Sequence, residues 1–180
     1  MRSLINKSFI PLFLILCLLL ATGCSDKNIG DKTTEPLDRL INGLLKKDTA
    51  LYKSAFPPDY IDRATNAFDA IGNDIDKVLS ELFTDALDAH IVNYGEKTRI
   101  NYTLISKEEL SSGDLDKYWD LIVNGYDLPV DKITEAYRAT VDVTVKGRDS
   151  EVTKRAEYKL LHIDGVWYLH PEVFMNVFSG

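Results

Sequence analysis

The amino-acid sequence predicts an α+β domain, in which N-terminal helices pack on an antiparallel sheet. Between residues 34 and 94, apolar residues recur at helical spacing, whereas from residue 98 they mostly alternate with polar ones. The dipeptide Asp164-Gly165 is typical of a two-residue hairpin turn. Long strands joined by tight turns indicate a meander with helices on one face.

Four helices are expected before the first strand, over residues 35–47, 48–56, 59–71 and 74–94. Thr34 and Asp48 stand where N-caps are preferred, and Asp74-Ile75-Asp76 is typical of the negatively charged start of a helix. The last helix is the clearest, because an apolar stripe runs from Ile75 to His90 and the opposite face is charged. A further helix is expected after Asp114 as its cap, and Gly125 would end it.

Four strands are predicted, over residues 98–104, 133–146, 151–163 and 166–172, and Pro171 limits the pairing of the last one. A two-residue turn pairs Ile163 with Val166, which sets His162 opposite Trp167 and His170 opposite Lys159. One face of the second strand is expected to hold the alternating residues Ile133, Tyr137, Ala139, Val141, Val143 and Val145.

The chain begins with a short apolar run. Arg2 and Lys7 are the only charged residues before Asp26, and residues 9–21 are almost wholly apolar. A membrane-spanning helix needs about 20 apolar residues, so this run fits the apolar core of a secretory signal peptide better. An uncleaved anchor is the alternative.

The end of that run, "LATGC" (20–24), resembles the lipobox of bacterial lipoproteins, although Ala21 stands where Leu is commonest. In that family the residue matching Cys24 carries diacylglycerol on its sulfur, acyl chains such as palmitate hold it in the membrane, and the chain is cut between Gly23 and Cys24. The resemblance implies a lipid-anchored protein on the extracytoplasmic face of a cell membrane. Ser25, which is not the Asp of inner-membrane retention, leaves outer-membrane transfer open in a cell with two membranes.

Three regions follow from this reading: a signal peptide (1–23), an acylated Cys24 with a polar tether (24–35), and one domain (36–180). Without the leader, 19 basic residues face 28 acidic ones, and this acidic balance argues against nucleic acid as a partner. Cys17 would leave with the leader, so no thiol would remain for a disulfide, a metal or catalysis.

The order of elements and the ending "LLHIDGVWYLHPE" (160–172) resemble the NTF2-like, or cystatin-like, fold of small secreted lipoproteins. The resemblance covers about residues 34–172 and contains no catalytic motif. It implies a curved sheet that wraps the helices into a cone with a pocket at the open end. Another α+β meander with helices on one side is the alternative.

The sequence contains no metal-ligand, phosphate-loop or dinucleotide motif, so no metal and no cofactor is expected. Enzymes with the NTF2-like fold use Asp, His or Tyr inside the cone for proton transfer. Possible pocket residues here are His90, Tyr102, Tyr137, Tyr158 and Trp167. Packing in the core is the alternative for each of them, as it is for the other aromatic candidates, Tyr118, Trp119, Tyr168, Phe174 and Phe178.

The sequence therefore favours a non-catalytic, membrane-anchored lipoprotein that binds a small ligand or a protein of the cell envelope. The alternative is an NTF2-like isomerase, dehydratase or hydrolase that transfers protons through a pocket His or Tyr. A third possibility is an assembly module that uses the outer face of the sheet.

Overall fold

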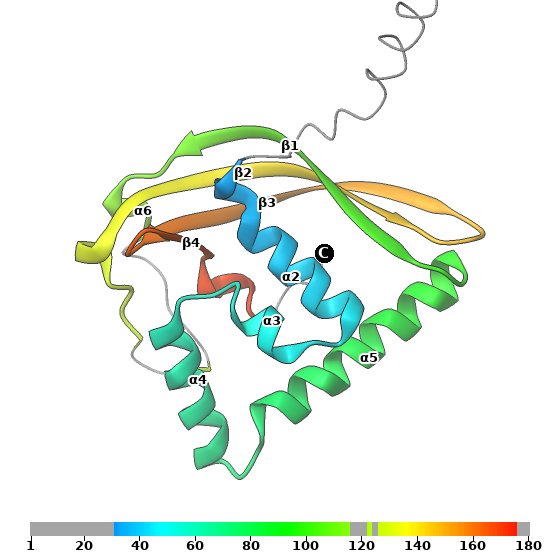
Figure 1. Cartoon of the computed structure of the whole chain (residues 1–180), viewed down its shortest axis with the longest axis horizontal. Coiled ribbons are helices and arrows are strands. Elements are labelled where there is room, and N and C mark those ends of the chain that lie inside the picture. The colour runs from blue at the N-terminus through cyan, green and yellow to red at the C-terminus, as the bar shows by residue number, and fades with distance from the viewer. Residues whose placement is uncertain (1–30, 116–121, 124–125, 176–180) are drawn as a thin grey trace, which may run out of the picture.

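The computed structural model describes residues 31–115, 122–123 and 126–175, which form helices followed by a sheet (Figure 1). The α-helices are α2 (Glu35–Lys46), α3 (Thr49–Lys53), α4 (Pro58–Ala70), α5 (Ile75–Tyr94) and the short α6 (Ser112–Leu115). The strands are β1 (Arg99–Glu109), β2 (Ile133–Lys146), β3 (Glu151–Ile163) and β4 (Val166–Leu169). Single 3-10 turns are η2 (Lys32–Thr34), η3 (Val130–Lys132) and η4 (Pro171–Val173). The expected signal peptide and Cys24 lie outside the described residues.

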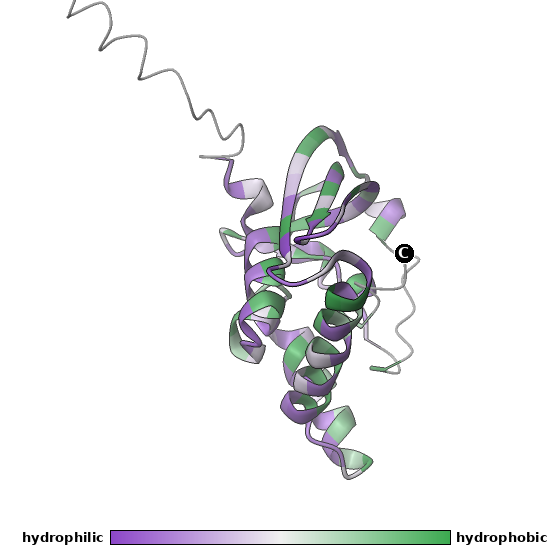
Figure 2. Ribbon diagram, turned by 90° about the vertical axis from the view of Figure 1, so that its right-hand side faces the viewer, coloured by the Kyte–Doolittle hydropathy of each residue, from purple (hydrophilic) through white to green (hydrophobic). Residues whose placement is uncertain are grey.

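The four strands form one open antiparallel sheet in the order β1-β2-β3-β4. The sheet arches over α2, α3 and α5, which lie on its concave side (Figure 1). The predicted α+β class is thereby confirmed. Figure 2 shows hydrophilic and hydrophobic residues interspersed along the helices, and none of the helices within the described ranges combines the length and hydropathy that a membrane span requires.

Of the three expected caps, Thr34, Asp48 and Asp114, only Asp48 caps its helix as predicted, and Asp74, expected at a negatively charged helix start, is the cap of α5. The Asp48 carboxylate accepts a hydrogen bond from the Leu51 amide at 2.9 Å, and the Asp74 carboxylate accepts one from the Asp76 amide at 2.8 Å. Thr34 does not cap α2 with its side chain, because it belongs to η2, and its hydroxyl donates instead to the carbonyl of Asp31. The predicted tether (24–35) is therefore wrong for residues 32–34, which form a 3-10 turn.

The second difference is at α6, which begins at Ser112 rather than after Asp114. The Asp114 carboxylate accepts hydrogen bonds from the amide and the hydroxyl of Ser111, at 3.0 and 2.6 Å. Asp114 therefore satisfies donors ahead of the helix from a position inside the first turn. Most of the rest of the expected helix lies outside the described residues.

An aromatic cluster fills the core where α3, α4 and α5 meet the C-terminal residues. Its rings are fully buried, and neighbouring ring centres lie 4.9 Å apart for Tyr52 and Phe83, 5.0 Å for Phe56 and Phe174, and 5.5 Å for Tyr60 and Phe174. The Tyr52 hydroxyl donates to the carbonyl of Phe174 at 2.6 Å. Phe174, one of the aromatic candidates that the sequence offers for a binding site, is thus a core residue.

A smaller core lies on the opposite face of the sheet and contains Leu110, Leu115, Ala136, Leu161 and Ile163. Ile133 packs against this core, although its position in the alternation predicts the face of Tyr137. The cause is an irregularity in the pairing of β2 with β3 between Ile133 and Glu135. One extra residue on a strand moves the following side chain to the other face.

The C-terminal end of α5 is tied to the turn between β2 and β3. The Asp149 amide donates to the Tyr94 carbonyl at 3.0 Å, and the Arg148 amide donates to the Glu96 carbonyl at 2.9 Å. A Cβ atom on Gly147 would overlap the carbonyl of Tyr94, so glycine permits this close approach. The helix end is therefore held at the far tip of the sheet.

Candidate ligand-binding cavity

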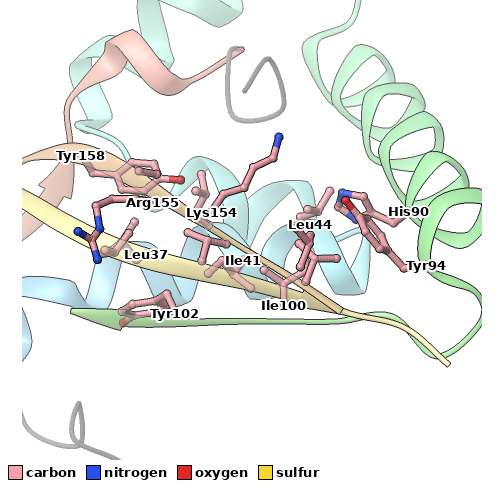
Figure 3. Close-up of a pocket in the computed structure, with 16 residues that line it drawn as sticks. Leu37, Ile41, Leu44, His90, Tyr94, Ile100, Tyr102, Lys154, Arg155 and Tyr158 are labelled. Carbon is pink, nitrogen blue, oxygen red and sulfur yellow. The ribbon is translucent and has the colours of Figure 1, made fainter. Parts of the chain in front are cut away.

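A cavity of about 260 Å³ lies between α2, the last turns of α5 and the concave face of β1, β2 and β3 (Figure 3). Most of its wall is aliphatic: Leu37, Leu40, Ile41 and Leu44 from α2, Ile100 from β1, Val141, Val143 and Val145 from β2, and Val152 and Ala156 from β3. The polar side chains of the lining are His90, Tyr94, Tyr102, Lys154, Arg155 and Tyr158.

The local sequence explains why a space remains here. Residues 37, 40, 41 and 44 repeat at helical spacing, so α2 turns one aliphatic face toward the sheet. The side chains that the strands turn toward α2 are small or β-branched at every second position, such as Val143 and Ala156. The space between these aliphatic side chains of α2 and the sheet remains open.

His90 brings the most distinctive polar atom to the cavity. It extends from α5, and its ring centre lies 5.9 Å from that of Tyr94. Its Nδ1 atom is buried and has no hydrogen-bond partner among the described residues. Burial lowers the pKa of His90 below its ordinary value, which favours the neutral ring. An unpaired buried nitrogen costs free energy, and a ligand that hydrogen-bonds to it would recover that cost.

Tyr102 lines the cavity with its ring but uses its hydroxyl elsewhere. The oxygen lies 3.0 Å from an Asp38 carboxylate oxygen and 3.2 Å from the Thr34 carbonyl. Burial raises the pKa of Tyr102 to about 12, and it also raises the pKa of Asp38. The Tyr102 hydroxyl is hydrogen-bonded to the start of α2, and its raised pKa keeps it protonated. It is therefore a structural group that is poorly suited to proton transfer.

Tyr158 differs from Tyr102, because its hydroxyl is not hydrogen-bonded to the start of α2. Its side chain is half-buried, and burial raises its pKa. The hydroxyl makes no hydrogen bond to another described residue. Together with Tyr94, this residue places aromatic surface at the edges of an otherwise aliphatic wall.

The charged residues of the lining are both cationic. Lys154 lies on β3 between Val152 and Ala156 in the alternation that faces the helices. The Arg155 guanidinium is bound by the Asp142 carboxylate, with N–O distances of 2.8 and 3.1 Å. No Asp or Glu belongs to the part of the lining that the structure describes. Sequence reasoning missed Lys154, although its place between Val152 and Ala156 in the alternation can be read from the sequence.

The cavity brings together His90, Tyr102 and Tyr158 of the five residues that the sequence proposes for a pocket. Tyr137 and Trp167 differ from this expectation. They lie at the other end of the sheet, where their ring centres are 5.7 Å apart and Trp167 stacks on His162 at 4.7 Å. Both side chains lie on the concave face, as the alternation predicts. They lie too far along their strands to reach the cavity.

The last hairpin has the register that its turn predicts. Ile163 pairs with Val166 and His162 with Trp167, and the His170 amide donates to the Lys159 carbonyl at 2.9 Å. Among the described residues, no group of three or more His, Cys, Asp or Glu side chains is placed to hold a metal ion.

Comparison with known proteins gives no match: no family model, no curated protein and no solved structure is significantly similar to this chain. The cavity is therefore the feature from which a function can be inferred. A mostly aliphatic wall with a few polar groups is typical of small-molecule sites.

Proposed function

We propose that this protein is a lipid-anchored extracytoplasmic binding protein that holds a small ligand between α2, α5 and the sheet. The observation that carries the proposal is the cavity of about 260 Å³, with its aliphatic wall and the unpartnered Nδ1 atom of His90. Ligand sites typically combine an apolar lining with a few polar groups that orient the ligand.

The alternative, proton-transfer enzyme of the NTF2-like class has less support. The element order agrees with that fold, and His90 does line the cavity. A catalytic His is commonly oriented by a carboxylate, and the described lining contains none. The Tyr102 hydroxyl is bonded to Asp38 and Thr34.

The lipid anchor rests on the lipobox-like sequence around Cys24, and the start of the domain is consistent with it. The described residues begin at Asp31, whose carboxylate lies 2.8 Å from Lys107 Nζ on β1. Residues 25–31 span at most about 25 Å when extended. With Cys24 acylated, the β1 edge of the domain would lie close to the bilayer.

The cavity can be tested with N-phenyl-1-naphthylamine, a neutral fluorescent probe of apolar sites. We expect saturable binding at one site, which Val143→Phe abolishes by filling the space. Val166→Phe is the matched control, because Val166 is exposed on the hairpin and does not line the cavity. Failure of the probe to bind, or equal binding by both variants, would contradict the proposal.

The anchor can be tested separately in bacterial cells by labelling with a palmitate analogue and by membrane fractionation. Cys24→Ala should abolish labelling and release the protein from the membrane fraction. A Cys24→Ala protein that is still labelled and still membrane-bound would show that the anchor has been misassigned.

A further inference from the structure

One buried polar atom of the cavity has no hydrogen-bond partner among the described residues. It is the Nδ1 atom of His90, whose side chain belongs to the lining. No other side chain in the described part of the lining has a buried polar atom in the same condition. Leaving such an atom unpaired costs free energy, which a bound ligand can recover. The cavity therefore favours a ligand with one hydrogen-bonding group.

The state of the His90 ring narrows the choice of that group. Figure 3 shows the ring reaching from α5 toward α2 and the space between the helix and the sheet. Burial lowers the pKa of His90 and so favours the neutral ring, in which one nitrogen carries a hydrogen and the other accepts one. A hydroxyl group can donate to Nδ1 or accept from it, so it suits both forms of the neutral ring. An ether oxygen suits only the form with a hydrogen on Nδ1.

The rest of the lining favours a ligand without charge. The wall of α2 and the facing valines of β2 offer only aliphatic contact, and an unpaired charge or a second hydroxyl is expensive to bury against such a wall. The Arg155 guanidinium is bound by the Asp142 carboxylate at 2.8 Å, and the Lys154 side chain is exposed. Neither cation therefore places a buried counter-charge against the wall.

Resting on the proposed function, we infer that the ligand is a neutral aliphatic molecule with a single hydroxyl group, which His90 Nδ1 binds while the chain of the molecule lies against α2 and β2. The volume of about 260 Å³ lies below the roughly 300 to 1,000 Å³ of drug-sized sites. A free medium-chain alcohol suits this volume better than a lipid with two acyl chains.

Calorimetric titration of the full chain with octanol and heptyl methyl ether tests the inference. The two compounds are isomers, and only octanol has a hydroxyl group. We expect octanol to bind about fivefold more tightly than the ether, which is the usual size of one net hydrogen bond. Octanoate, which replaces the hydroxyl group by a carboxylate, should bind more weakly than octanol.

Variants at His90 locate the hydrogen bond. His90→Phe keeps an aromatic ring and removes Nδ1, so it should abolish the octanol advantage and leave the affinity for the ether unchanged. His90→Leu should do the same with a smaller side chain, and ether binding by either variant shows that the cavity is intact. His162→Phe is the matched control, because His162 stacks on Trp167 outside the lining, and it should preserve the advantage.

The inference is overturned if wild-type protein shows no octanol advantage, if the advantage survives at position 90 without the histidine, or if His162→Phe removes it equally. Tighter binding of octanoate than of octanol would overturn the neutral character of the ligand. If N-phenyl-1-naphthylamine binds the cavity and octanol does not, the inference fails while the proposed function stands. If neither compound binds, the proposed function fails as well.

Discussion

The two ends of the space under the sheet are built differently. At one end, Tyr52, Phe56, Tyr60, Phe83 and Phe174 interlock with ring centres about 5 to 6 Å apart and no exposed surface. At the other end, α2 and the strands meet through aliphatic side chains and leave about 260 Å³ open. Helix α5 contributes to both ends, through Phe83 to the filled end and through His90 and Tyr94 to the cavity.

Under the proposed ligand-binding function, the difference means that one end of the domain supplies stability and the other end supplies the binding site. Aromatic rings bury much area each and pack at defined angles, so the filled end can supply most of the core energy. The residues around the cavity then contribute less to the unfolding free energy than the aromatic cluster does. Substitutions at the two ends should therefore have unequal costs.

The largest effect is expected from Phe83→Ala. Phe83 is fully buried against Tyr52, and the loss of such a ring costs about 3 to 5 kcal/mol of unfolding free energy. Ile41→Ala, at the half-buried wall of the cavity, should cost only about 1 kcal/mol, because few contacts are lost where space is already open. Urea unfolding measures both. If the two substitutions lowered the unfolding free energy by the same amount, the two ends would not differ in their contribution to stability.

An intermediate effect is expected where α2 and α3 approach each other at the boundary between the two ends. A Cβ atom on Gly43 would lie 2.6 Å from the backbone nitrogen of Tyr52, so Gly43→Ala should destabilise the domain by about 1 to 3 kcal/mol. Gly113→Ala is the matched helical control, because its Cβ would meet nothing nearer than 3.9 Å. If the two variants have the same midpoint of thermal unfolding, the close approach is unimportant.

The smallest effect is expected at the Lys53–Asp76 ion pair, which joins α3 to α5 at the filled end with a shortest N–O distance of 2.7 Å. The hydrogen bond from Lys53 lowers the pKa of Asp76 below its ordinary value. As pH falls, the unfolded chain binds this proton first, so the contribution is complete above about pH 4 and is lost as pH falls through the folded pKa.

Lys53→Met should therefore lower the unfolding free energy at pH 7 by about 0.2 to 1 kcal/mol, since Asp76 is half exposed. Near pH 2 the variant and the wild type should unfold at the same denaturant concentration. A difference between them that stayed constant from pH 7 to pH 2 would show that packing of the Lys53 stem, rather than its charge, is what matters.

Local chemistry made part of this structure predictable from sequence. A two-residue Asp-Gly turn and the pleat of the strands fix every pair of the last hairpin, so the pairing of His162 with Trp167 follows from residue numbers alone. The Asp48 and Asp74 carboxylates accept hydrogen bonds from amides in the first turn of the following helix, so the sequence alone predicts the Asp48 cap and a helix start at Asp74.

The positions that sequence reasoning misplaced depend on contacts between distant segments. The face of Ile133 changes at a pairing irregularity with β3, which the alternation of one strand does not show. Tyr137 and Tyr158 both belong to the concave face, but only Tyr158 lines the cavity. Which part of a strand remains uncovered depends on where the helices end, and that is a property of the packed domain.

The contact between Gly147 and Tyr94 gives the cavity an adjustable depth. The turn from β2 to β3 holds the end of α5 through backbone hydrogen bonds, and glycine sets the shortest possible separation. A larger residue at position 147 would lift the helix, and with it His90, away from the sheet. A substitution at position 147 would thus change the size of the cavity, although Gly147 does not line it, and would leave the chemistry of the lining the same.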